Sequence, residues 1–266
     1  MVRGVIPVYW YFREKVRDYL RDHIVDPFRA CTVRGHHIRI GLSNPLEGFR
    51  ISTYSTKEPE TLDWIESTMS DGDILYDVGA NIGLYSIYAA MAHPNSQVYA
   101  FEPESLNFTR LMRNIRANRL KNVFPVNIPI CETTGFDFLY LSGVMAGSAL
   151  HGFGDANRSP EKIKQGSLGI SLDDLVFRYG LPQPHHIKID VDNIEEAIIR
   201  GADKVIRAPL FKSLLVEITA PNPQQSAIHS YLYERGLELI AESKWEIKVG
   251  DETAKNFIYR KTRPRA

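Results

Sequence analysis

The chain of 266 residues is 44% hydrophobic and 24% charged, a composition typical of a globular protein with a large core. Its 32 basic and 32 acidic side chains cancel, so we expect no binding of nucleic acid, because neutralising phosphates requires an excess of Lys and Arg. The two cysteines, Cys31 and Cys131, exclude a disulfide framework, and no apolar run reaches the roughly 18 residues that cross a bilayer. Because no signal-peptide cleavage pattern follows the early apolar run 5–12, we expect a cytoplasmic protein.

The first 58 residues differ in pattern from the rest, and we treat 1–58 as an N-terminal extension of a main domain over 59–266. Aromatic and charged side chains alternate at helical spacing over 9–28, which predicts an amphipathic helix. Most such helices pack on their own domain, and peripheral contact with a membrane or a partner is the alternative. A short strand over 36–42 and a loop over 44–48 complete the extension.

Beyond residue 59, helical and strand patterns alternate with short connections. Helical spacing predicts helices over 60–69, 84–92, 105–120, 171–179, 195–206 and 226–235. Short apolar runs predict strands over 74–78, 97–101, 123–130, 187–191, 214–218, 237–241 and 256–260. This alternation is typical of a parallel sheet that helices cover on both faces, so we predict a doubly wound, Rossmann-like α/β fold.

The segment 142–169 breaks the alternation. It follows an alternating, exposed strand predicted over 136–141 and holds five glycines without a clear period. A long irregular loop in a compact domain is usually a lid or a binding loop. Because it lies between the third and fourth strands of the main alternation, we place it near the carboxyl edge of the sheet and predict a substrate loop.

A glycine-rich turn directly follows the predicted strand 74–78 and precedes a helix. The turn, residues 77–83, reads Asp-Val-Gly-Ala-Asn-Ile-Gly, and we expect it to present free backbone N–H groups at the helix start. Glu102 ends the next strand, 102 − 83 = 19 residues beyond Gly83. An acidic residue at that spacing is typical of one that binds ribose hydroxyls.

The glycines of this turn favour S-adenosylmethionine over a dinucleotide. A dinucleotide fingerprint requires glycine at positions 79, 81 and 84, and Asn81 and Leu84 depart from it. The Asn81 side chain would fill the space of a diphosphate, whereas S-adenosylmethionine carries a sulfonium and an ammonium that favour carboxylates. We therefore predict a cofactor site formed by Asp77, Gly79, Ala80, Asn81, Gly83, Glu102 and Ser105. Two alternatives are a nicotinamide-dependent oxidoreductase or epimerase, and a glycine turn that binds no ligand.

Together the motifs resemble the FkbM family of S-adenosylmethionine-dependent methyltransferases. The resemblance covers residues 58–218 and is carried by 77–83, Phe101-Glu102-Pro103 with Asn107, 187–191, Arg200-Gly201-Ala202 and Val216-Glu217-Ile218. It implies a class I methyltransferase fold with seven mostly parallel strands and the methylation of a hydroxyl on a sugar, glycan or secondary metabolite. The chain departs from the family at Asp192-Asn193, where Glu-Gly is typical. That departure keeps open a non-catalytic, methyltransferase-like binding module that works through 1–58.

The acceptor side is predicted from residues at the ends of two strands. Lys188 and Asp190 share one face of the strand 187–191, and Lys188 is either a desolvated base or half of an ion pair. Asp190 and Glu217 end neighbouring strands at the edge where ligands bind, so we predict Asp190, Lys188 and Glu217 as catalytic residues. With Asp192 they could hold Mg²⁺, but we favour contact with a loop or a substrate hydroxyl and predict no metal. His151, in the substrate loop, is a weaker candidate base.

Overall fold

The computed structural model describes residues 8–20, 27–143, 145–149, 151–154, 162–192, 194–220, 225–243, 247–249 and 252–262. Asn193, half of the departure from the family pattern, lies outside the described residues, as do residues 21–26 of the predicted N-terminal helix. None of the described helices is long and apolar enough to span a bilayer.

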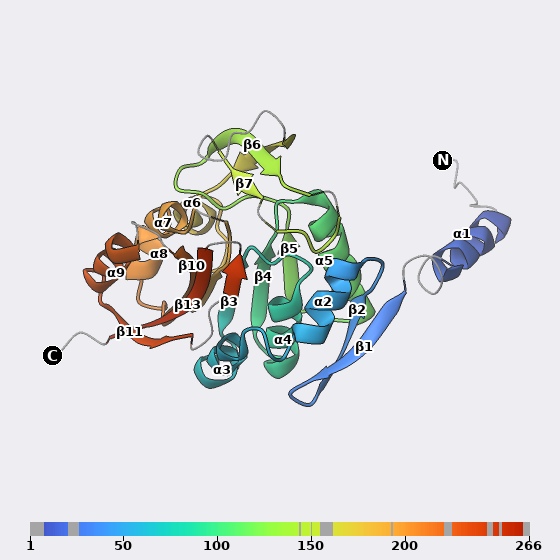
Figure 1. Cartoon of the computed structure of the whole chain (residues 1–266), viewed down its shortest axis with the longest axis horizontal. Helices are drawn as coiled ribbons and strands as arrows, with labels where there is room; N and C mark the ends of the chain where they lie inside the picture. Colours follow the sequence, from blue (N-terminus) through green and yellow to red (C-terminus); the bar gives the residue numbers. More distant parts are fainter. Residues whose placement is uncertain are drawn as a thin grey trace, which may run out of the picture.

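A twisted central sheet organises the chain (Figure 1). Its strands follow the order β11-β13-β10-β9-β3-β4-β5, and β12 pairs with β13 beside this path. The strands are β3 (Ile74–Val78), β4 (Gln97–Phe101), β5 (Val123–Val126), β9 (His186–Ile189), β10 (Ser213–Ala220), β11 (Leu237–Glu242), β12 (Ile247–Val249) and β13 (Glu252–Lys261). Five adjacent strands from β5 to β10 are parallel, and β13 runs antiparallel to its neighbours. The predicted sheet of seven mostly parallel strands is confirmed.

Helices cover both faces of this sheet, as predicted. One face carries α3 (Pro59–Thr68), α4 (Leu84–Ala92) and α5 (Ser105–Ala117), and the other carries α6 (Leu172–Phe177), α7 (Glu195–Arg200), α8 (Asp203–Arg207) and α9 (Gln225–Tyr233). Leu75 of β3 packs in the first core, whereas Tyr76 and Val78 pack in the second. Because successive side chains of one strand are buried on opposite faces, the strands read as continuous apolar runs.

The predicted helix 195–206 is wrong as one element, since it divides into α7 and α8. The break falls at Gly201, which packs against the backbone that follows β5. A Cβ on Gly201 would lie 2.5 Å from the carbonyl oxygen of Cys131, so this close approach requires glycine. Helical spacing in the sequence reports only which side chains are apolar, and it continues across the break.

The N-terminal extension contributes to the main core from residue 28 onward. Strands β1 (Phe28–Val33) and β2 (His36–Gly41) form a hairpin, and the buried side chains of Ile38 and Ile40 join the core with α4 and α5. The predicted loop over 44–48 is instead the start of helix α2 (Pro45–Thr53). Asn44 caps this helix by accepting the N–H of Glu47 at 3.0 Å, and proline opens it, so these residues signal a helix start rather than a loop.

Helix α1 (Val8–Leu20) stands apart from the rest of the chain in Figure 1. The described side chains of Phe12, Val16, Tyr19 and Leu20 are all exposed. The expected packing of this helix on its own domain is therefore not observed, and membrane or partner contact stays a prediction.

A second, antiparallel sheet replaces the irregular loop expected over 142–169. Strands β7 (Gly152–Phe153) and β8 (Ile163–Gly169) pair with the two sides of β6 (Gly135–Leu141). In β8 only Gly169 is buried, so the strand carries no apolar alternation that the sequence could reveal. The residues between β6 and β7 still reach the carboxyl edge of the central sheet, where they cover a cavity.

Candidate functional site

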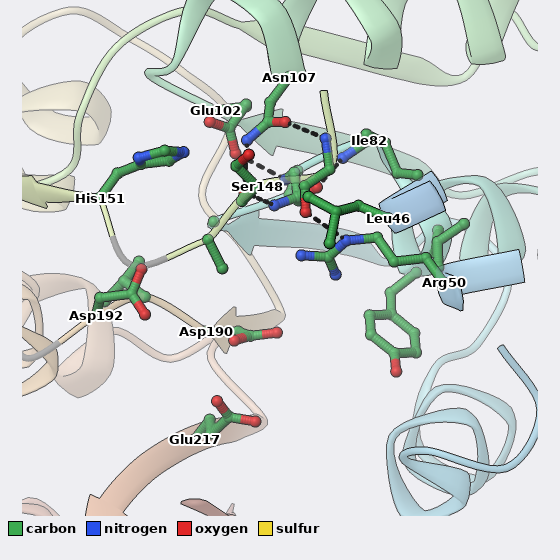
Figure 2. A pocket seen from close by; sticks show the side chains of 18 of the residues that line it. Leu46, Arg50, Ile82, Glu102, Asn107, Ser148, His151, Asp190, Asp192 and Glu217 are labelled. Carbon is green, nitrogen blue, oxygen red and sulfur yellow. Dashed lines mark hydrogen bonds between the residues drawn. The ribbon is translucent and has the colours of Figure 1, made fainter. Parts of the chain in front are cut away.

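A cavity of about 360 Å³ opens at the carboxyl edge of the central sheet. Figure 2 shows that its wall combines residues from the sheet edge with residues from α2. The sheet edge supplies the turn after β3, Glu102 after β4, the residues after β9 and Glu217 of β10. Parallel sheets bind ligands at this edge, and the volume lies in the range of small-molecule sites.

Two glycines give the turn its shape. Gly79 has a φ of +84° and packs on the backbone of Asp190, and Gly83 has a φ of +90° and packs on Leu111 of α5. Neither position leaves room for a side chain. The N–H groups of 79–83 are all used within the protein, by Phe101, Glu102, Ala80 and Asn81. The expectation of free N–H groups is therefore wrong for 79–83, since the carbonyls of Phe101 and Ala80 and the side chains of Glu102 and Asn81 accept them.

Glu102 lies in the cavity and is held by two backbone donors. It accepts the N–H of Asn81 at 2.7 Å and the N–H of Glu104 at 2.9 Å. Burial raises the pKa of Glu102 to about 7, although these two bonds oppose the shift. Each carboxylate oxygen has a second lone pair, so Glu102 can also accept hydroxyl groups of a ligand.

The predicted cofactor residues divide into two groups. Gly79, Ala80, Asn81 and Glu102 line the cavity. Asp77, Gly83 and Ser105 are not among its lining residues. Asp77 is buried under the turn, where it accepts the Ser86 hydroxyl at 2.5 Å, and Ser105 is exposed and bonded to Gln165. The structure therefore assigns Asp77 and Gly83 to the support of the turn.

The covering loop, residues 145–149, closes the cavity over the glycine turn. The Ser148 carbonyl accepts the side-chain amides of Asn81 at 2.8 Å and Asn107 at 3.1 Å (Figure 2). Arg50 donates from α2 to another carbonyl of the same loop at 2.8 Å. The glycine turn, the covering loop and α2 thus form one hydrogen-bonded unit. No pattern in the sequence predicted that Arg50 would hold the covering loop.

Lys188 is buried at the floor of the cavity. Its Nζ lies 2.7 Å from Asp190 Oδ2, 3.9 Å from Asp77 Oδ1 and 4.9 Å from the centroid of the Tyr85 ring. Burial alone lowers the pKa of Lys188, but the neighbouring Asp190, Asp77 and Glu58 carboxylates raise it well above its usual value. A lysine held protonated cannot accept a proton, so of the two interpretations the geometry favours the ion pair.

Three carboxyl groups from distant parts of the chain meet beside Lys188. Oxygens of Glu58, Asp190 and Glu217 all lie within 4.8 Å of one another. Lys57 Nζ lies 2.7 Å from Glu58, so each of two carboxylates has an ammonium partner. Burial, with Asp190 and Glu58, raises the pKa of Glu217 well above its usual value. Neither Lys57 nor Glu58 belongs to a motif, and only the fold brings them to this site.

His151 also lines the cavity, beyond the covering loop. Its Nδ1 accepts the N–H of Ser142 at 3.2 Å, and burial lowers its pKa. Nε2 has no hydrogen-bond partner within the described part of the chain. Because Nδ1 accepts, the neutral imidazole carries its proton on Nε2, which can donate a hydrogen bond to a ligand, and the role of His151 as a base stays a prediction.

The strand order, the glycine turn after β3 and the acidic residue after β4 define a class I methyltransferase fold. The Methyltransferase FkbM domain matches residues 77–239, and the chain therefore belongs to the FkbM methyltransferase family. The hexuronic acid methyltransferase AglP of Haloferax volcanii is 27% identical over 209 residues, which cover 77% of this chain and 81% of that protein.

A second relative and a solved structure are similar to the chain in sequence and in fold, respectively. The 31-O-demethyl-FK506 methyltransferase FkbM of Streptomyces tacrolimicus is 43% identical over 49 residues, 18% of this chain and 19% of that protein. The crystal structure of a transferase from Pyrococcus horikoshii superimposes with a TM-score of 0.50 at 12% identity, covering 88% of this chain and 71% of that one. The first likeness is local, and the second concerns the fold alone.

Proposed function

We propose that the protein transfers a methyl group from S-adenosylmethionine to a hydroxyl of a sugar, glycan or secondary metabolite. The observation that carries the proposal is that one cavity joins the glycine turn and Glu102 to the cluster of Lys188, Asp190 and Glu217. A cofactor half and an acceptor half in one enclosure are what group transfer requires. Relatives named as methyltransferases of a hexuronic acid and of 31-O-demethyl-FK506 support this substrate class.

The residues of the cofactor half fit S-adenosylmethionine better than a dinucleotide. The N–H groups of 79–83 are already bonded inside the protein, so a diphosphate would find no free donor among them. Glu102 can receive two ribose hydroxyls. A sulfonium, unlike a diphosphate, is stabilised near the carboxylates that line the other half.

In the acceptor half, Lys188 supplies a positive charge and Glu217 accepts a proton. S-adenosylmethionine supplies an electrophilic methyl group whose carbon–sulfur bond breaks as the acceptor oxygen forms its bond to carbon. Lys188 remains protonated and fixes Asp190. Glu217 Oε2 is buried and has no partner among the described residues, and its raised pKa makes the ionised carboxylate a stronger base than an ordinary one. We assign to Glu217 the acceptance of the hydroxyl proton.

Calorimetry and a transfer assay test this proposal together. We expect the intact protein to bind S-adenosylhomocysteine and not NAD, and to transfer tritiated methyl groups to members of a panel of sugars and small-molecule extracts. Binding of NAD in place of S-adenosylhomocysteine would reject the cofactor assignment. Binding of S-adenosylhomocysteine without transfer to any hydroxyl compound, or with transfer to amines, would reject the assigned reaction.

A further inference from the structure

Glu58 reaches the acceptor half of the cavity from outside the residues that the family model matches. It directly precedes α3, whereas the family match begins at residue 77. Glu58 is 1% exposed and lines the cavity together with Lys57. A carboxylate is buried this deeply only with partners, so its place in the cluster needs a physical reason.

The cluster has more carboxyl groups than ammonium groups. Lys57 pairs with Glu58 and Lys188 pairs with Asp190, each at 2.7 Å. Glu217 is the third carboxyl group, within 4.8 Å of the other two. Its Oε2 is buried without a hydrogen-bond partner among the described residues. An ionised Glu217 would therefore leave one uncompensated negative charge, and a single bound proton removes that charge.

The other polar groups described around the cavity do not neutralise the extra negative charge of an ionised Glu217. Arg50 of α2 donates a hydrogen bond to the covering loop, and its positive charge lowers the pKa of Asp190. Tyr85 of α4 stays neutral, because burial and Glu58 raise the pKa of its hydroxyl. Asp192 lines the same cavity and adds negative charge. Opposite Glu217 on β13 stands Asn256, which carries no charge.

We propose that the negative charge of Glu58 keeps Glu217 protonated until the positively charged methyl donor arrives. Glu58 is then a positioning residue that acts through Glu217. The catalytic consequence rests on the proposed function, whereas the effect of Glu58 on Glu217 is a property of the cavity alone. When a sulfonium binds, its charge would replace that of the proton, the proton would leave to solvent, and the ionised Glu217 could then accept the proton of the acceptor hydroxyl.

Carbon-13 NMR of the full chain, labelled at the glutamate carboxyl carbons and titrated with pH without ligand, tests this effect of Glu58 on Glu217. We expect at least two carboxyl signals to titrate far above the usual range, because Glu102 also does so. Glu217→Gln removes one of them and so assigns it. In Glu58→Gln the midpoint of the Glu217 signal should fall by roughly one pH unit or more, since a like charge has been removed at close range.

Two further variants separate electrostatics from structural damage. Lys57→Met removes a cation from the same cluster, so it should move the Glu217 midpoint upward. Asp63→Asn changes the net charge as Glu58→Gln does, but Asp63 is a 70% exposed side chain on α3, and the midpoint should stay unchanged. Circular dichroism checks that each variant is folded.

Three outcomes would overturn the proposal. One is an unchanged Glu217 midpoint in folded Glu58→Gln, another is a Glu217 signal with an ordinary midpoint in the wild type, and the third is a midpoint that Mg²⁺ lowers, which would mark a cation site. Binding of S-adenosylhomocysteine is measured on the same samples. If the wild type does not bind S-adenosylhomocysteine but shows the expected titration pattern, the proposed function is refuted and the effect of Glu58 on Glu217 still stands.

Discussion

A side chain on Gly79 would collide with the backbone of Asp190. A Cβ built there overlaps the carbonyl oxygen of Asp190 and lies 2.9 Å from its carbonyl carbon. The turn that we assign to the cofactor therefore touches the strand end that we assign to the acceptor. This contact fixes the separation of the two halves of the cavity.

Gly79→Ala should reduce both stability and cofactor binding. The substitution adds the collision with Asp190 to the strain of a φ of +84°, so we expect the free energy of unfolding to fall by roughly 2 kcal/mol or more. Urea unfolding measures this change. Gly72→Ala is the matched control, because Gly72 has a φ of +85° and nothing within 4 Å of the added carbon. Equal losses in the two variants would show that the close approach to Asp190 is unimportant.

Binding of S-adenosylhomocysteine should strengthen as pH rises through about 7. Burial raises the pKa of Glu102 to about 7, so the free protein carries a proton there below this pH, and the ribose hydroxyls favour the ionised form. Binding must then release a proton, which calorimetry detects in buffers of different ionisation enthalpy. Glu102→Gln should bind at least tenfold more weakly, a loss on the order of one charged hydrogen bond. Its affinity should show no such pH dependence between pH 6 and 8. A wild-type affinity that is flat over this range contradicts the role of Glu102.

Lys188→Met should destabilise the protein strongly. The substitution leaves Asp77 and Asp190 without their shared cation in a buried site, and loss of one partner of a buried pair costs about 3 kcal/mol or more. Part of this loss should be recovered in the double variant with Asp190→Asn. Arg200→Met is the control, because Arg200 forms an exposed pair with Glu196 along α7 and should change stability little. A small effect of Lys188→Met would mean that the ion pair is not structural.

Asn107→Ala should loosen the covering loop. Asn107 donates to the Ser148 carbonyl and accepts the N–H of Gly147 at 2.7 Å, so two buried hydrogen bonds are lost. We expect affinity for S-adenosylhomocysteine to fall several-fold and protease cleavage within 145–149 to quicken, as about 1 kcal/mol per bond implies. Asn118 caps the C-terminal end of the same helix, α5, and is bonded to Arg39 instead, so Asn118→Ala should leave both measurements unchanged. Identical behaviour of the two variants would argue against a fastening role.

The central sheet could be predicted because burial on both faces leaves a strong local trace. The ranges expected for β3, α4 and β4 coincide with those observed, since each is bounded by turn residues and filled with apolar side chains. The position of Glu102 followed from the same regularity, because the strand places it at the edge beside the glycine turn.

The rest of the site depends on contacts that no local pattern records. Asn44 donates to the carbonyl of Ala146, 102 residues away, and this kind of pairing brings α2 to the covering loop. Glu58 precedes an ordinary helix and gains its role only because Asp190 after β9 and Glu217 within β10 lie beside it. Strands β7 and β8 escaped prediction for a related reason, since β7 has only two residues and β8 has a single buried residue, so neither shows an apolar period.

The most direct test of the account is a crystal structure of the protein with S-adenosylhomocysteine bound. We predict that the ribose hydroxyls lie within hydrogen-bonding distance of Glu102 and that the sulfur faces Asp190 and Glu217 across the cavity. A ligand bound elsewhere, or a ligand in the cavity with its ribose away from Glu102, would contradict the assignment of the two halves.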